Sequence, residues 1–408
     1  MVHLTRRSLL AAAPALALAP RLAAAATPTE HKGIYAFYSD ATAGIMKAVV
    51  DRFEAANPGV MVSAEEIGWD NLQQRLTTDI SGGTTPDVAV IATRWILDYA
   101  QGSIAEPLDG YITPDYRAGF FDSLMGPSSV GGKLYGLPFD ASTRALYYNT
   151  DMLAAAGVAA PPATWDELRV MAGKVKAGGK GYGFGLQGKE IETDTYWYYP
   201  LWTHGGNIVE NGKSGIASPA AIAATKLYKG LIDDGLTQPS PTAYNRQDVE
   251  TLFKQGRAAT IITGPWLMGQ LAKEAPNIKY KVAPIPKTTV EATWSGTDSV
   301  ILFANSKNKA LAWKFMSQAM VTPASTLDLT LKEGFLPTTH SAADNPQVKA
   351  EFGAFTSLLP VAKFAPQVPN WPQVVDITIA ALQRVYLGQE AAEAALGHAA
   401  AQINDIIA

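Results

Sequence analysis

The chain of 408 residues contains no cysteine. This absence excludes disulfide bridges, zinc sites built on thiolates, catalysis by a thiol and a lipid anchor on a cysteine. Histidine is also rare. The four histidines after residue 26, His31, His204, His340 and His398, are too scattered along the sequence for a zinc cluster. The sequence therefore predicts no metal site and no cofactor.

Clusters of basic residues are missing as well. Lys and Arg together number 33 and Asp and Glu number 37, so the formal net charge is −4, with no basic run. This argues against nucleic acid or an anionic membrane surface as a partner. Apolar residues make up 47% of the chain, which is typical of a globular protein. The length predicts about two domains.

The first 26 residues have the pattern of an export signal. Arg6 and Arg7 precede an apolar stretch at residues 9–19, and alanines at 23–26 suit a signal peptidase. The segment TRRSLL resembles the twin-arginine motif of the pathway that exports folded proteins, although an ordinary secretory signal with two arginines would look similar. No apolar segment of about 20 residues follows. Because no cysteine is present to carry a lipid, the sequence predicts a soluble protein of a bacterial periplasm.

Strand and helix patterns alternate after this signal. Apolar runs predict strands at residues 34–38, 60–66 and 88–92, and apolar residues at helical spacing predict helices at 45–53 and 72–80. This β-α-β-α-β order predicts a parallel sheet flanked by helices, with ligand-binding loops at the carboxyl ends of the strands. We expect a second α/β region over about residues 145–295.

The sequence contains little that indicates nucleotide binding or catalysis. The segment GFGLQG at residues 183–188 matches the dinucleotide-binding pattern by letters, but no helical pattern follows it. We interpret it as a strand whose glycines let another backbone segment approach. The phosphate-binding loop and the serine nucleophile motif are absent. Asp140, Glu192 and Asp194 could supply an acid/base pair for glycoside cleavage, but no fixed spacing supports that role.

Aromatic residues, in contrast, are concentrated in one segment and near predicted element ends. Residues 196–202 read YWYYPLW, which we expect to form a loop. Tryptophans beside glycine, proline, arginine or asparagine are Trp69, Trp95, Trp266, Trp294 and Trp371. Flat rings stack on the C–H faces of sugars while a few polar groups bind the hydroxyls. Trp266 follows an apolar run where a strand gives way to a helix, so we predict that it contacts ligand, whereas Trp165 and Trp313 lie in amphipathic helix patterns and are expected in the core.

Several short motifs occur in a specific order along the chain: DRFEAANPGV, GGTTPDVAVI, GKLYGLPFDASTRALYYNTDMLAAAGV, PPATWDELRVMAGKV, IITGPWLM and NSKNKALAWKFM. Together they resemble family 1 extracellular solute-binding proteins, the sugar receptors of ABC importers, which include maltose-binding and glycerol-3-phosphate-binding proteins. The resemblance implies two α/β lobes joined by a hinge that close on a ligand. It places the first lobe at residues 27–140 and 298–334, the second at 145–294 and 338–408, and the hinge crossings at 141–144, 295–297 and 335–337.

The resemblance also implies which residues contact the ligand. Where the motifs align, these are Tyr38, Ser39, Asp40, Trp69, Thr93, Arg94, Trp95, Asp140, Ser142, Tyr196, Trp197, Trp266 and Trp371. Maltose-binding relatives carry carboxylates in two of these segments, where this chain has Arg94 and Ser142. A phosphate site would rest on Arg94 alone. The resemblance therefore implies a sugar or sugar derivative and leaves its identity open.

The implied activity is binding without catalysis, by a monomer that delivers its ligand to ABC permease subunits. Three alternatives stay open. The aromatic residues also suit a quaternary amine through cation–π attraction, and the acidic net charge suits a polyamine. The carboxylates of Asp140 and Asp194 would suit a secreted glycoside hydrolase.

Overall fold

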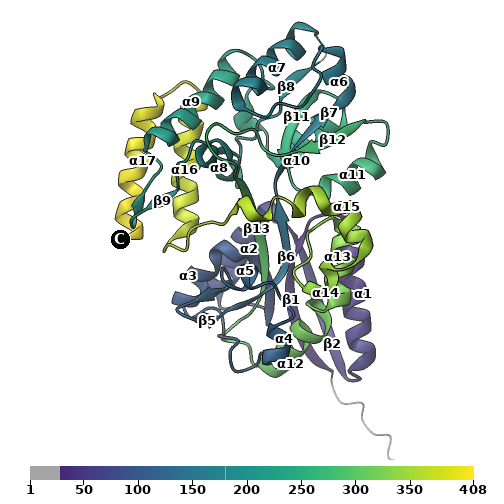
Figure 1. The fold of residues 1–408 in the computed structure, drawn as a ribbon. Helices are drawn as coiled ribbons and strands as arrows, with labels where there is room; N and C mark the ends of the chain where they lie inside the picture. Colours follow the sequence, from purple (N-terminus) through teal and green to yellow (C-terminus); the bar gives the residue numbers. More distant parts are fainter. Residues whose placement is uncertain (1–27, 180) are drawn as a thin grey trace, which may run out of the picture.

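The computed structural model describes residues 28–179 and 181–408, so the predicted export signal lies outside the described residues. Figure 1 shows two lobes, one above the other, each with a β-sheet covered by helices. Within the described ranges, no helix is both long and apolar enough to cross a membrane.

The first lobe, the lower one in Figure 1, is built on a sheet with the strand order β14-β13-β3-β1-β2, and β6 pairs with β13. Its strands are β1 (Thr29–Phe37), β2 (Val60–Gly68), β3 (Val88–Ala92), β6 (Gly136–Thr143), β13 (Thr293–Leu302) and β14 (Ala362–Lys363). β1 pairs in parallel with β2 and β3, whereas β13 runs antiparallel to β3 and β6. Every residue of β3 is buried, as expected for a strand with helices on both faces.

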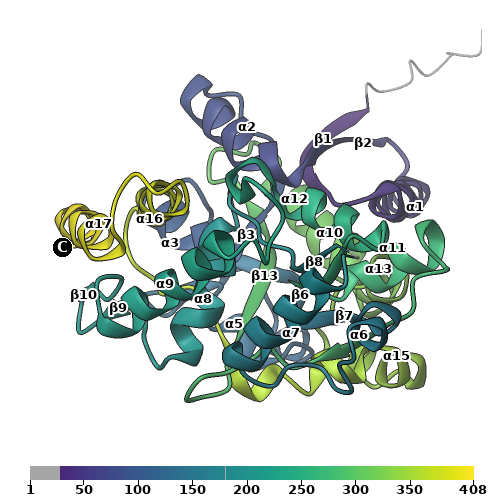
Figure 2. The ribbon, with the colours of Figure 1, turned by 90° about the horizontal axis from the view of Figure 1, so that it is seen from above.

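Helices cover this sheet on both sides (Figure 2). They are α1 (Asp40–Ala56), α2 (Trp69–Gly82), α3 (Ile96–Gln101), α4 (Pro114–Arg117), α5 (Asp122–Met125), α12 (Lys309–Phe315), α13 (Pro323–Glu333) and α14 (His340–Ala343). The 3₁₀ turn η1 (Thr93–Trp95) follows β3, and the hairpin β4 (Ser129–Val130) and β5 (Lys133–Leu134) precedes β6. α2 ends at Gly82, and Gly83, which has a left-handed φ of 67°, caps it.

The second lobe has a four-stranded sheet with the order β12-β7-β11-β8. Its strands are β7 (Ala145–Asn149), β8 (Tyr182–Phe184), β11 (Ala258–Thr263) and β12 (Tyr280–Ala283), with a separate hairpin of β9 (Val209–Glu210) and β10 (Lys213–Ser214). Its helices are α6 (Thr150–Ala155), α7 (Trp165–Ala177), α8 (Thr193–Thr203), α9 (Pro219–Asp233), α10 (Arg246–Lys254), α11 (Trp266–Glu274), α16 (Trp371–Tyr386) and α17 (Ala392–Ile407). Figure 2 shows α16 and α17 at one edge, beside α9 and the hairpin.

The glycine-rich segment at residues 183–188 forms no nucleotide-binding turn. Gly183 belongs to β8, and a Cβ atom added to it would lie 2.1 Å from the Cβ of Ala172 in α7. Gly185 would meet Ile261 and Val249 at 2.8 and 2.9 Å. These glycines let a helix and a strand pack closely against the backbone, as the sequence interpretation expected.

The aromatic segment at residues 196–202 is a helix rather than the expected loop. It lies within α8, and every residue of this helix is buried. Its neighbours explain the difference, because α8 packs against α9, α16 and the start of β13. A helix enclosed on all sides is apolar all around, so it shows none of the helical periodicity that would have revealed it in the sequence.

The lobes are joined where β6 passes into β7 through Arg144, and where β13 begins. Leu336 pairs with Ala141 of β6, so the predicted crossing at residues 335–337 does not lead into the second lobe. The prediction that the chain enters the second lobe at residue 338 does not hold either, because the segment after Leu336 stays on the first lobe. The backbone N–H of Phe121 donates to Thr338 O (3.3 Å), and that of His340 donates to Gly119 O (3.0 Å). These bonds hold α14 on the first lobe, and α15 (Pro346–Thr356) packs against α14 and β6.

A buried histidine lies in the core of the first lobe. His31 of β1 is fully buried, its ring centroid is 4.8 Å from that of Phe315, and its Nδ1 is 3.5 Å from a carboxylate oxygen of Asp87. Burial lowers the pKa of His31 to about 4, although the Asp87 carboxylate opposes this shift. The folded protein therefore holds His31 neutral at a pH where the unfolded chain protonates it.

This histidine should make the protein less stable in mild acid. The unfolded chain binds a proton at His31 near pH 6.5 and the folded protein only near pH 4, so stability is fully present above pH 6.5 and is lost as the pH falls below it. We expect a loss of about 2 kcal/mol in the free energy of unfolding between pH 7 and pH 5 from this residue. Urea unfolding of the wild type and of His31→Phe at both pH values measures it. An equal pH dependence in the two proteins would contradict the prediction.

Candidate functional site

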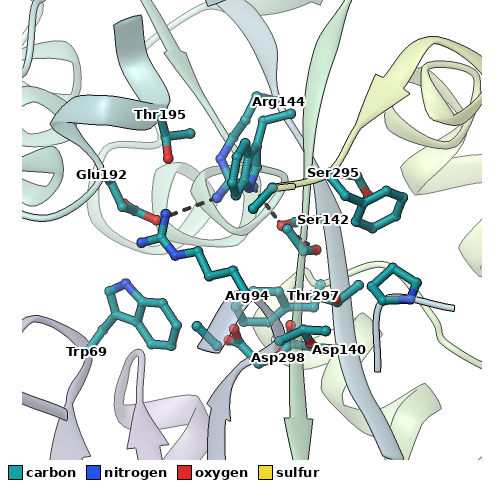
Figure 3. A pocket seen from close by; sticks show the side chains of 18 of the residues that line it. Trp69, Arg94, Asp140, Ser142, Arg144, Glu192, Thr195, Ser295, Thr297 and Asp298 are labelled. Carbon is teal, nitrogen blue, oxygen red and sulfur yellow. Dashed lines mark hydrogen bonds and ion pairs between the residues drawn. The ribbon is translucent and has the colours of Figure 1, made fainter. Parts of the chain in front are cut away.

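A cavity lies between the two lobes. Its lower wall comes from the end of β3 and from β6 and β13, and its upper wall comes from the starts of α8, α10 and α11. Figure 3 shows the side chains that point into this space. The carboxyl end of β3 delivers η1 to the cavity, as expected for an open α/β sheet.

The cavity brings together part of the predicted ligand-contacting set. The predicted residues that line it are Tyr38, Trp69, Thr93, Arg94, Asp140, Ser142 and Trp266. They come from five separate segments of the chain and from both lobes. Their convergence supports the prediction that they form one site, while contact with a ligand stays a prediction.

The other predicted residues lie outside the cavity lining. Ser39 caps α1 and its hydroxyl donates to Glu333 (2.7 Å), and Asp40 is exposed in the first turn of that helix. Trp95 is buried behind Trp69. Tyr196 and Trp197 are buried within α8, where Trp197 Nε1 donates to Thr225 (2.8 Å).

Trp371 likewise lies outside the lining. It is 1% exposed at the first position of α16. The predicted roles of Trp197 and Trp371 therefore gain no support from their positions, because large aromatic side chains also fill cores.

Sequence reasoning missed several lining residues. These are Arg144, Arg246, Ser295, Thr297, Asp298 and Phe335, together with Glu192, which was considered only as an acid/base group, and Trp294, which was noted as an aromatic candidate but not included in the predicted contact set. One signal was present. The segment TWSGTDS at residues 293–299 is polar although it leads directly into an apolar strand. Such a polar stretch inside a buried strand needs partners, and a ligand is one source of them.

Aromatic rings from both lobes line the cavity, and other rings hold them in place. Trp69 stacks on Trp95 with centroids 6.0 Å apart and planes at 12°. Trp294 stacks on Trp202 at 5.8 Å and 10°. Trp266 is fixed by a hydrogen bond from its Nε1 to Glu250 (2.8 Å). The flat surfaces are therefore rigid before any ligand arrives, which lowers the entropy cost of binding.

An ion pair links the two lobes across the cavity. Arg94 of η1 lies in the first lobe and Asp194 of α8 lies in the second, with Nη1 and Oδ2 3.3 Å apart. The Asp194 side chain is fully buried and that of Arg94 is 7% exposed. Burial raises the pKa of Asp194, and the Arg94 guanidinium opposes that shift. The pair therefore joins η1 of the first lobe to α8 of the second.

A second charged group lies on the upper wall, where Glu192 contacts two arginines. Its carboxylate oxygens lie 3.6 Å from Arg144 Nη2 and 3.2 Å from Arg246 Nε. Both guanidinium groups also lie over the Trp266 ring, with Cζ 4.5 and 4.7 Å from its centroid. Glu192 has a left-handed φ of 75°, which costs about 1 kcal/mol or more for a residue with a Cβ. The cation–π contacts and ion pairs hold this strained residue in position.

The lower wall carries two neighbouring carboxylates. Asp140 of β6 and Asp298 of β13 lie opposite each other in the strand register. The Tyr38 hydroxyl contacts Asp140 Oδ2 (3.1 Å) and, more closely, Asp298 Oδ2. Burial raises the pKa of Asp140 well above its usual range, and the Asp298 carboxylate adds to that shift. Burial also raises the pKa of Asp298 to about 7.

The arrangement of the carboxylates does not favour a glycoside hydrolase that uses Asp140 and Asp194. Asp194 does not line the cavity, and its carboxylate pairs with Arg94, so Asp140 and Asp194 do not form an exposed acid/base pair. Over residues 28–179 and 181–408, no three acidic or histidine side chains are grouped closely enough to hold a metal ion. What the cavity offers is stacking surfaces, charged groups and hydrogen-bonding hydroxyls, which is the chemistry of a binding site.

Comparison with known proteins agrees with this geometry. Residues 38–324 match the family model of bacterial extracellular solute-binding proteins. The chain belongs to this family. A binding protein of Brucella abortus is 48% identical to this solute-binding protein over 392 residues, which cover 95% of each chain. The galactooligosaccharide-binding protein of Bacillus subtilis is 27% identical over 375 residues, covering 87% of this chain and 85% of the relative.

Solved structures show the same fold. An ABC transporter solute-binding protein of Thermotoga lettingae, bound with α-D-tagatose, superposes with a TM-score of 0.86 at 25% identity, covering 93% of this chain and all of the other. The predicted family and the two-lobed α/β fold of this solute-binding protein are therefore confirmed.

Proposed function

We propose that this protein is the substrate-binding component of an ABC importer and that it captures a sugar or sugar derivative between its lobes. One observation carries the proposal: the cavity is lined from both lobes by rigid aromatic rings that alternate with buried hydrogen-bonding side chains. Apolar ring faces and few polar groups suit the two kinds of surface on a sugar. The relatives named for galactooligosaccharide binding and crystallised with tagatose support the same class of ligand.

The proposed ligand contacts are the predicted residues that line the cavity, Tyr38, Trp69, Thr93, Arg94, Asp140, Ser142 and Trp266, joined by Trp294. Trp69 and Trp294 each have a second ring behind them. A pyranose stacked on such a supported ring loses water from both surfaces at little cost in side-chain entropy. The buried polar groups then fix its orientation.

Ligand binding would act by shifting an equilibrium between open and closed lobes. Contacts from the second lobe exist only in the closed form, so a ligand that touches both lobes favours closure. We propose the predicted hinge crossings at residues 141–144 and 295–297 as the pivots. In the closed form the Asn370 backbone N–H also donates to Asp98 (2.8 Å), a contact between α16 and the first lobe. A closed monomer would then deliver the ligand to two permease subunits in the membrane.

A calorimetric titration tests the proposal. Purified protein is titrated with neutral mono- and oligosaccharides, and separately with choline, betaine and spermidine. We expect saturable binding of at least one sugar with a Kd near the micromolar range, which corresponds to about −8 kcal/mol. Binding only of amines that lack a sugar ring would contradict the proposal. Steady release of product from aryl-glycosides would show an enzyme instead.

We further propose a periplasmic location reached through the twin-arginine pathway, from the sequence TRRSLL at residues 5–10. The double substitution Arg6→Lys and Arg7→Lys should leave the precursor inside the cell, because the pathway requires the arginine pair. Fractionation and immunoblotting measure the periplasmic share. A single substitution Arg21→Lys, outside the pair, is the matched control. Normal export of the double variant would indicate the ordinary secretory route.

A further inference from the structure

The two carboxylates on the lower wall differ from the other acidic groups near the cavity. Asp140 and Asp298 are 2% and 8% exposed and both line the cavity. Figure 3 shows them together on one side of the space, with Glu192 and Arg144 on the opposite side. Asp140 and Asp298 lie directly opposite each other where β6 pairs with β13, so the sheet itself holds the two carboxylates close together.

Among the described residues, no basic side chain lies within ion-pair distance of Asp140 or Asp298. The neighbouring arginines are engaged elsewhere: Arg94 pairs with Asp194, and Arg144 donates to Ser142 Oγ (2.6 Å) and pairs with Glu192. Over residues 28–179 and 181–408, the Tyr38 hydroxyl is the one side-chain donor to the two carboxylates, and the Asp298 backbone N–H also donates to Asp140. These donors bring no positive charge to the buried pair.

Unpaired hydroxyls in the same cavity are a second and independent sign of a ligand. Ser295 and Thr297 of β13 are 1% and 6% exposed and line the cavity, yet neither hydroxyl has a hydrogen-bond partner among the described residues. The hydroxyl of Thr195, on the opposite wall, is also buried and also lacks a hydrogen-bond partner among the described residues. Figure 3 places Thr297 next to Asp298. A buried hydroxyl without a partner is rare, because it has lost its hydrogen bonds to water and gained none in the protein.

We infer that Asp140 and Asp298 bind a protonated primary amine carried on the ligand, so that the ligand is an amino sugar or an oligosaccharide that contains one. This inference rests on the proposed function. An ammonium group supplies one positive charge and three N–H donors, which match two carboxylates and a neighbouring hydroxyl such as that of Thr297. The hydroxyls of the same sugar ring can pair with Ser295 and Thr195.

The chemistry of the pocket selects this group over related ones. A quaternary ammonium has no N–H and would leave the carboxylates without hydrogen bonds. An acetylated amine has no charge and is wider. A neutral hydroxyl supplies one donor and no charge, so its hydrogen bond to a buried carboxylate is weaker than that of an ammonium group.

Matched sugars test the inference. The protein is titrated with D-glucosamine, D-glucose and N-acetyl-D-glucosamine, with the corresponding galactose set, and with the β-1,4-linked glucosamine disaccharide, its diacetylated form and cellobiose. We expect the amine member of at least one set to bind at least ten-fold more tightly than both neutral members. Equal or tighter binding of the neutral members overturns the inference and leaves the proposed function standing. No binding in any of the sets overturns the inference and also counts against the sugar-binding function.

Variants tie the preference to the carboxylate pair. In Asp298→Asn, which keeps the shape but removes one negative charge, the ratio of amine to neutral affinity should fall from ten or more to about one. Asp140→Asn provides the same test if the first variant does not fold, as judged by circular dichroism and thermal unfolding. Asp115→Asn removes the same charge from the exposed helix α4 and should keep the ratio. An undiminished ratio in both cavity variants overturns the assignment to this pair.

Discussion

Substituting Arg94→Met should weaken ligand binding by about 100-fold or more. The reason is the ion pair between the lobes, in which Asp194 is fully buried and Arg94, at 3.3 Å, is its one basic partner in the described part of the chain. Without the guanidinium, closure would bury an unpaired carboxylate, and removing one partner of such a pair typically costs about 3–5 kcal/mol. The lobes avoid this cost by staying open, so the loss appears in affinity. Calorimetry with the best-binding sugar and small-angle scattering of the ligand-bound protein measure both effects.

Two further variants separate closure from direct contact with the ligand. In Arg94→Met with Asp194→Asn the unpaired charge is gone, and we expect part of the affinity to return. Arg75→Met is the matched control, because Arg75 pairs with Glu65 and Asp79 within the first lobe at its surface and such pairs contribute little. An affinity that stays low in the double variant would mean that Arg94 acts by touching the ligand. Unchanged affinity in the single variant would contradict the closure mechanism.

Substituting Trp266→Ala should cost about 2–4 kcal/mol of binding free energy. The ring lines the cavity and also carries Arg144 and Arg246 over its surface, so its removal takes away a ligand surface and frees both arginines. Glu250, 2% exposed, would lose the Nε1–H donor as well, and folding stability should fall too. Calorimetry and urea unfolding of the same variant measure the two losses separately.

Trp313→Ala is the matched control for this experiment. Trp313 lies in α12, half-buried against Tyr111 and Tyr116 and away from the cavity. Its removal should lower the free energy of unfolding, because packed aromatic surface is lost, and should leave the affinity for the ligand unchanged. If Trp266→Ala behaves in the same way, Trp266 is a core residue and the role predicted for it is wrong.

A carboxylate pair that binds an ammonium group bears on the two amine ligands that the sequence leaves open. A quaternary amine was considered because of the aromatic residues, and a polyamine because of the net charge. The structure places two carboxylates without a basic partner on one wall and supported tryptophans around them. A ligand with a sugar ring and one ammonium group would use both features, whereas a polyamine would use only the first.

Several local elements could be predicted because neighbouring residues determine them. The strand β3 occupies the predicted residues 88–92, since five apolar residues in a row between Asp87 and Thr93 suit a strand buried on both faces. The helix α2 ends at Gly82 because the left-handed Gly83 after it satisfies its last carbonyl groups. The glycines of β8 were correctly interpreted as places of close packing.

Composition, local periodicity and the order of motifs thus determined the fold class, the family and seven of the 24 residues that line the cavity. The rest depended on contacts between distant segments. α8 is a helix because α9, α16 and β13 enclose it, which no pattern of its own reveals. Asp298 became part of the cavity only through its register opposite Asp140, and Arg94 met Asp194 only because the lobes close. Burial and pairing of charges depend on how the lobes pack, and a single sequence carries no local signal of that packing.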